Sequence, residues 1–228
     1  MKRGFTLLEV LIALAIFSII SIATVRQISM IRNTKNAAFE EIDLYSGLRS
    51  TFSIIKSDLN QAFHVLTDDL GEDIAKSIAR NEKVPHTLFD GKKDELVFTS
   101  LSNRNYYRGR RQSEQTEISF YLKTKAGHKF PTLMKRQSGL IDGDLYNGGN
   151  SYTLLENIST LEFQFWDEKN AKWTDKWNSD LGSFRDRFPY AVKMIIGVVN
   201  TNNKELKLTT VFKIAFSNND GYLVKSFQ

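Results

Sequence analysis

The chain has 228 residues, a formal net charge of +5 and no cysteine, so disulfides, thiolate catalysis and cysteine-based metal sites are excluded. Hydrophobic residues make up 41% of the sequence and aromatic residues 12%, which suffices for one sizeable core and argues against disorder. The net charge is too small to indicate nucleic-acid binding by itself.

An apolar segment near the N-terminus is long enough to cross a membrane. From Phe5 to Val25 the sole charged residue is Glu9. At about 1.5 Å per residue, a helix of this length spans roughly 30 Å, the thickness of a bilayer core. Because Lys2 and Arg3 precede the segment, the positive-inside rule places the N-terminus in the cytoplasm and the bulk of the chain on the far side.

Two simpler interpretations of this segment explain less. A cleaved secretory signal peptide needs small residues at its cleavage site, and Ala23 with Val25 is a poor match. A plain transmembrane anchor leaves Glu9 unexplained, because an ionisable group in a bilayer is costly and is by default functional. Neither interpretation accounts for the junction between Gly4 and Phe5.

The short basic leader ending in Gly4, the following Phe5 and the carboxylate of Glu9 resemble the processing signature of type IV pilin-like proteins. The resemblance implies that a prepilin peptidase cleaves between Gly4 and Phe5 and methylates the new N-terminus at Phe5. It also implies that Glu9 is an assembly residue, whose carboxylate neutralises the α-amine of a neighbouring subunit in a filament. Such a pairing removes two costly charges from an apolar environment.

Beyond the anchor the apolar residues keep a helical period. They recur mostly at intervals of three or four from Ile28 to Phe63, and this stretch contains no proline. The pattern predicts one helix from about Phe5 to Val65, roughly 90 Å long at about 1.5 Å per residue. An alternative with two helices joined near residues 33–36 stays open.

From Glu95 onward the pattern changes to period two, which predicts strands separated by segments rich in Gly, Asn, Asp and Ser. Apolar residues alternate from Leu161 to Phe165, so one face of that strand is expected to be buried. The stretch from Ala191 to Val199 is more continuously apolar and is expected to be central. A long helix followed by a mainly antiparallel sheet predicts an α+β head. The predicted strands are Glu95 to Leu101, Glu117 to Lys123, Thr132 to Arg136, Thr160 to Asp167, Ala191 to Val199 and Glu205 to Phe216.

These elements and the pilin-like signature divide the chain into four expected parts. They are a leader peptide at residues 1–4, a transmembrane or filament-core helix at 5–25, an amphipathic helix at 26–65 and a periplasmic α+β head at 66–228.

Short motifs spread over most of the chain carry a second resemblance. They are Leu48-Arg49, Ile55 to Gln61, Glu95 to Thr99, Leu154 to Ile158, Leu161 to Asp167, Trp173, Trp177 and Phe188 to Lys193. Together they resemble the J-type minor pseudopilins of type II secretion systems. Residues 66–94 carry no motif that can be assigned.

The second resemblance implies a pilin-like fold and a low-copy subunit of a pseudopilus tip complex. Such a tip initiates pseudopilus assembly for the export of folded proteins across the outer membrane. The implied partners are other minor pseudopilins, the major pseudopilin, the prepilin peptidase and the bacterial inner membrane, which the chain would cross once with its head in the periplasm. An alternative is a minor pilin of a type IV pilus or DNA-uptake system, which shares the N-terminal features and differs in the head.

Two polar stretches invite sharper hypotheses. Arg104 to Arg111 combines four arginines with two tyrosines, as a DNA-binding loop would, but a solvated loop or a contact with an acidic partner also fits, and no nucleic acid is expected. Asp142 to Asn150 gathers oxygen ligands as a calcium loop would. Its fifth and sixth positions are Tyr146 and Asn147, where an EF-hand needs an oxygen ligand and a glycine, so a tight turn is favoured.

The remaining candidate residues indicate neither a metal site nor an enzyme. The three histidines are far apart in the sequence and do not have the spacing of a metal-binding motif: His64, His86 and His128. Three tryptophans could form a binding platform, but packing in the core or at a sheet edge is favoured for them: Trp166, Trp173 and Trp177. Because no nucleophile, metal or phosphate-loop constellation is present, no catalysis and no cofactor are expected.

Overall fold

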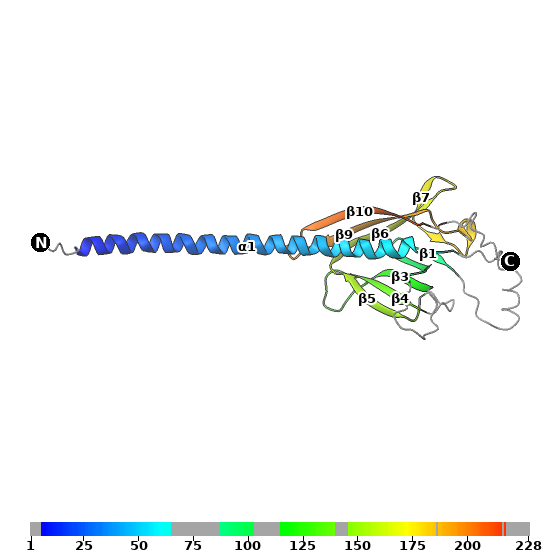
Figure 1. Cartoon of the computed structure of the whole chain (residues 1–228), viewed down its shortest axis with the longest axis horizontal. Coiled ribbons are helices and arrows are strands. Elements are labelled where there is room, and N and C mark those ends of the chain that lie inside the picture. Colours follow the sequence, from blue (N-terminus) through cyan, green and yellow to red (C-terminus); the bar gives the residue numbers. More distant parts are fainter. Residues whose placement is uncertain are drawn as a thin grey trace, which may run out of the picture. The chain divides into compact units, whose positions relative to one another are not determined.

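A computed structural model of the chain describes residues 6–64, 87–102, 115–139, 146–185, 187–215 and 217. The chain divides into two compact units, Met1–Ser46 and Gly47–Gln228. Apart from Thr6, the described part of the first unit belongs to one long helix, α1 (Leu7–Asn60), whose last residues belong to the second unit, the head (Figure 1).

The prediction of one continuous helix is confirmed, because α1 runs through residues 33–36 without a break. It ends at Asn60, before the predicted end at Val65, which lies outside the described residues. The chain after Asn60 joins the sheet instead of continuing the helix. Ala62 forms a β-bridge with Ser100, and the backbone N–H of Leu101 donates to the carbonyl of Gln61 at 2.9 Å.

The described strands of the head form two antiparallel sheets. In spatial order, the first sheet contains β5 (Asn150–Leu155), β4 (Thr132–Ser138), β3 (Thr116–Lys123), β2 (Glu95–Ser100), β1 (Phe89–Gly91) and β8 (Trp177–Asn178). The second contains β10 (Glu205–Lys213), β9 (Ala191–Val199), β6 (Ile158–Asp167) and β7 (Lys172–Thr174). The α+β fold class is confirmed, although the strands form two sheets where the pattern predicted one.

The core of the head lies between the two sheets and the last turns of α1. From Gly47 onward one face of α1 is buried at helical spacing, through Leu48, Thr51, Ile55, Asp58 and Leu59. Phenylalanine rings connect the two sheets at the centre. Phe89 of the first sheet lies 5.7 Å from Phe165 of the second, between ring centroids, in an edge-to-face arrangement.

Each of the six predicted strands is present, with small shifts at the ends. The strand from Ala191 to Val199 lies between β10 and β6 and is therefore central, as predicted. Burial alternates from Leu161 to Phe165, so one face of β6 is buried, also as predicted. The last strand ends at Lys213, whereas the prediction extended it to Phe216, which lies outside the described residues.

Candidate functional site

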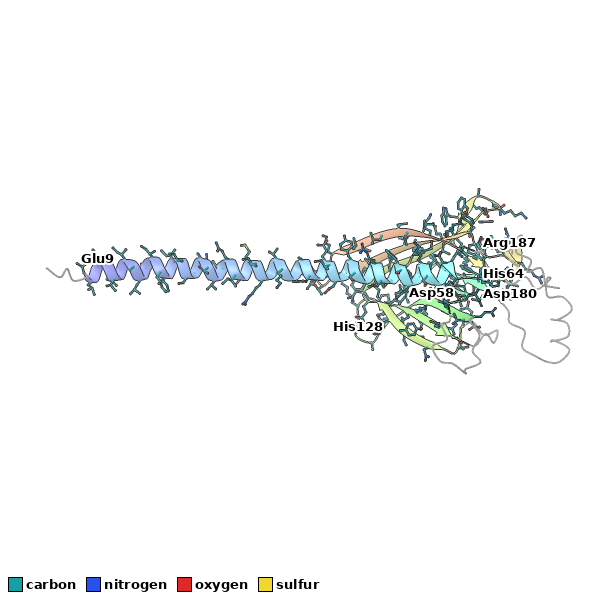
Figure 2. The ribbon with its side chains drawn as sticks, viewed as in Figure 1. Glu9, Asp58, His64, His128, Asp180 and Arg187 are labelled. Atoms are coloured by element: carbon teal, nitrogen blue, oxygen red, sulfur yellow. The ribbon has the colours of Figure 1, made fainter. Side chains whose placement is uncertain are left out.

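The predicted assembly carboxylate, Glu9, lies in the first turn of α1 (Figure 2). It accepts hydrogen bonds from Thr6. The backbone N–H and the hydroxyl of Thr6 each donate to Oε2 of Glu9 at 2.9 Å. In return the backbone N–H of Glu9 lies 3.3 Å from the hydroxyl oxygen of Thr6, to which it donates. This reciprocal arrangement is a capping box, which satisfies backbone donors at the helix start that have no partner within the helix.

The capping box leaves half of the carboxylate available for another partner. Both donors of Thr6 bind Oε2, and no hydrogen bond among the described residues uses Oε1 of Glu9. A carboxylate oxygen can accept further bonds while its neighbour is occupied. The geometry therefore allows Glu9 to cap its own helix and to pair with a cation from another molecule at the same time.

The surroundings of Glu9 are apolar and exposed. Leu7–Arg32 is long and apolar enough to cross a membrane, and the side chains of its most apolar window are not buried by the protein. Leu7 and Leu8 beside the carboxylate are 80% and 67% exposed. The hydroxyl groups of Ser18 and Thr24 donate to the carbonyls of Leu14 and Ile20, so they are satisfied within the helix. Glu9 is thus the one carboxylate of this span, and the next charged residue along the helix is Arg26.

Two of the predicted site residues, Gly4 and Phe5, lie outside the described residues, so the structure does not describe the expected cleavage junction. Thr6 is the residue that the sequence reasoning missed. The signal was present in the sequence, because threonine followed three residues later by glutamate at the start of an apolar run is the capping-box pattern.

The buried histidine of the described residues, His64, has structural contacts. His64 is buried, its Nδ1 lies 3.0 Å from the hydroxyl of Thr87, and its ring stacks on Phe188 with centroids 4.9 Å apart. Among the described residues no group of three or more His, Cys, Asp or Glu side chains could hold a metal ion. His86 lies outside the described residues.

The tryptophans take part in packing. Trp177 is 2% exposed, stacks on Phe184 with ring centroids 4.1 Å apart, and donates its indole N–H to the carbonyl of Arg187. Trp166 and Trp173 are half-buried, with ring centroids 5.2 Å apart on the neighbouring strands β6 and β7. Core and edge packing, the interpretation favoured from the sequence, agrees with these contacts.

The two polar stretches are described only in part. The arginine-rich run from Arg104 to Arg111 lies outside the described residues. Of Asp142 to Asn150, the described part begins at Tyr146, which donates its hydroxyl to the carboxylate of Asp90. Gly148 and Gly149 both have positive φ, of 76° and 72°, which fits the tight turn favoured from the sequence.

Two protein families match the chain, and between them they cover most of its length. The family described as the prokaryotic N-terminal methylation motif matches residues 1–25. The family described as type II secretion system (T2SS), protein J, matches residues 28–207. The first match covers the predicted cleavage site and Glu9, and the second covers the part of α1 from residue 28 onward and most of the head.

A solved structure also resembles the chain. It is the complex of GspK, GspI and GspJ from the type 2 secretion system of enterotoxigenic Escherichia coli. The matching chain has 16% sequence identity and a TM-score of 0.45, and the match covers 74% of this chain and 97% of that chain.

Proposed function

The chain belongs to the type II secretion system protein J family, a family of minor pseudopilins, and we propose that it acts in the tip complex that initiates pseudopilus assembly. It is a structural subunit and not an enzyme. The family match favours secretion over the alternative of a type IV pilus or DNA-uptake system, because the matched residues 28–207 include most of the head, where the two classes differ. The proposed function is therefore association with other subunits and with the membrane. The observation that supports it most directly is the exposed apolar helix with Glu9 in its first turn.

The apolar helix supports insertion in the bacterial inner membrane. A helix whose apolar side chains are exposed in the isolated chain needs a bilayer or other helices around it. The N-terminal methylation motif agrees with an anchored precursor. We infer a single pass with the leader in the cytoplasm and the head in the periplasm, because Lys2 and Arg3 precede the anchor.

Glu9 would act when the subunit leaves the bilayer and joins the filament. Cleavage after Gly4 by the prepilin peptidase would create a methylated α-amine at Phe5 on each subunit. The free Oε1 of Glu9 is suited to pair with the α-amine of a neighbouring subunit, while Oε2 continues to cap the helix. In an apolar surrounding this pairing is favourable, because either charge alone would be buried without a partner.

The first unit of the chain offers a second contact for neighbouring subunits. Beyond the membrane span, Phe39, Ile42 and Tyr45 recur every third residue and share one side of α1. They are 51%, 60% and 48% exposed. An exposed apolar stripe of this kind fits packing against the helix of another minor pseudopilin or of the major pseudopilin.

The proposal is tested by purifying the tagged full-length protein from membranes of its native host and analysing its N-terminus and its partners by mass spectrometry. A methylated Phe5 at the N-terminus together with other minor pseudopilins would support both processing and tip assembly. Recovery with pilus or DNA-uptake subunits would instead support the alternative function. An intact Met1 or a cut near Val25 would contradict the pilin-like processing.

A further inference from the structure

The four-stranded sheet of the head ends in an unusually long and regular strand. β10 pairs with β9 over nine consecutive residues, from Glu205 to Lys213, without a bulge. On its other side no strand of the described residues pairs with it, so it forms one margin of its sheet (Figure 1). Proteins usually shorten or bend such edges, because their free backbone groups can pair with another chain.

The backbone groups that face the open edge can be assigned from the register. The N–H of Asn200 donates to the carbonyl of Lys204 at 3.0 Å, and the N–H of Ile214 donates to the carbonyl of Tyr190 at 3.0 Å. Residues 204 and 214 lie just before and just after β10, and both bond toward the β9 side. Because hydrogen-bonded pairs alternate along an antiparallel ladder, the even-numbered residues of β10 bond to β9. The N–H and C=O groups of the odd-numbered residues therefore point to the open edge. They are residues 205, 207, 209, 211 and 213.

Along this edge two lysines, Lys207 and Lys213, flank the neutral Thr209 and Val211, and the strand begins with the acidic Glu205. Lys207 and Lys213 are exposed, and the ion pairs between described residues involve neither of them. Val211, which is 53% exposed, lies between them and opposite Lys193 of β9. Glu205, at the start of the strand, already accepts a hydrogen bond from the hydroxyl of Ser159 at 2.6 Å.

We propose that the open edge of β10 binds an extended, acidic segment of another protein, which adds a further strand to the four-stranded sheet. The backbone of the segment pairs with the outward groups of β10, which supplies affinity. Its carboxylates lie opposite Lys207 and Lys213, which fixes the register and selects acidic sequences. Lysines on an edge strand can also protect the edge against pairing with another chain. If that is their role here, the acidic segment does not bind.

A designed peptide tests the proposal on the full-length protein in detergent. The probe is an acetylated nine-residue peptide of threonine and valine with glutamate at its second and eighth positions, and the control carries lysine at both. We expect the glutamate peptide to bind at least about tenfold more tightly than the lysine peptide, and to bind more weakly at high salt. Binding should slow amide hydrogen exchange in residues 204–214.

Two substitutions at Val211 separate backbone pairing from simple charge attraction. Val211→Pro removes an N–H that points to the open edge, so it leaves the bonds between β10 and β9 intact. Val211→Thr keeps the N–H and serves as the matched control. We expect the proline variant to lose binding of the glutamate peptide by about tenfold or more and the threonine variant to keep it. The double variant Lys207→Glu and Lys213→Glu should reverse the preference, so that the lysine peptide binds more tightly than the glutamate peptide.

Three results would overturn the proposal. They are no binding of the glutamate peptide, equal binding of the glutamate and lysine peptides, and equal binding by Val211→Pro and Val211→Thr. If Val211→Pro does not fold, two other measurements still test the proposal. They are peptide binding by the double variant Lys207→Glu and Lys213→Glu, and amide hydrogen exchange of the native protein with bound peptide. The edge of β10 is separate from Glu9 and from the apolar helix, so this proposal can fail while tip assembly stands.

Discussion

Nζ of Lys135 on β4 lies 2.6 Å from Oδ2 of Asp58 in the last turns of α1, and the two side chains are only 8% and 6% exposed. Asp58 is also held through its backbone, because its carbonyl accepts a hydrogen bond from the hydroxyl of Ser100 at 3.0 Å. The end of the helix is thus attached to β4 through charge and to β2 through a hydrogen bond. The buried ion pair fixes which turn of α1 meets the first sheet.

Removal of one partner of this pair should destabilise the head strongly. Lys135→Met leaves the carboxylate of Asp58 buried without its cation, and such a change costs about 3 kcal/mol or more. The double variant Asp58→Leu and Lys135→Met removes both charges, so we expect it to be more stable than Lys135→Met alone. Chemical unfolding of the three proteins measures both effects. Equal stability of the single and double variants would show that the pair does not act as a unit.

The same pair should make stability depend on pH. Burial raises the pKa of Asp58, and Lys135 offsets only part of this effect. Because the folded protein holds this proton more tightly than the unfolded chain, stability falls as pH rises from the unfolded pKa through the folded one. Lys135→Met should raise the pKa of Asp58 further, so we expect its destabilisation to be larger near about pH 7.5 than near about pH 4.5. A loss that is independent of pH would contradict this mechanism.

Gly91 on β1 should tolerate no side chain. A Cβ at this position would meet the ring of Phe165 well inside normal contact distance, and Phe165 is fully buried against Phe89. Gly91→Ala should therefore lower the free energy of unfolding by about 1–3 kcal/mol. Addition of Phe165→Leu should recover part of the loss, since the smaller side chain makes room. Thermal unfolding of the two single variants and the double variant tests this coupling.

The elements that sequence patterns predicted are those whose burial follows a period. β6 and β9 bury alternating or continuous apolar side chains, and both were located closely. β5 was missed because four of its six residues are exposed, so it shows no alternation. β1 and β8 have only three and two residues and could not be separated from loops. The division into two sheets depends on contacts such as that between Phe89 and Phe165, which no local pattern reveals.

The candidate site was read almost entirely from local spacing. Glu9 was found because a carboxylate in an apolar span is unusual, whereas Thr6 was missed although threonine three residues before Glu9 is the capping-box pattern. The buried pair of Asp58 and Lys135 could not be predicted, because the two residues are far apart in the sequence and each resembles a surface residue. Long-range pairing of charges is set by the fold.

Thr6 and Glu9 should act together in assembly. Glu9→Ala removes both the proposed pairing with a neighbouring α-amine and the cap, so membrane insertion should persist while co-purification with other pseudopilins falls. Thr6→Val keeps the charge but removes a hydroxyl that binds Oε2, a cap worth about 1 kcal/mol, so we expect a smaller loss. Thr6→Ser should behave like the native protein. Normal co-purification and secretion with Glu9→Ala would remove this residue from the mechanism.

The stripe of Phe39, Ile42 and Tyr45 leads to a prediction that separates assembly from stability. These side chains belong to the first unit and are about half exposed or more, so the core of the head does not depend on them. Ile42→Asp should therefore leave thermal unfolding of the head unchanged while it lowers co-purification of other pseudopilins by about tenfold, as for a central contact residue. Glu41→Gln, a change on a neighbouring side of the same turn, is the control and should have little effect. If Ile42→Asp and Glu41→Gln assemble equally well, the stripe is not a subunit contact, and the helix would then associate through its membrane span and Glu9 alone.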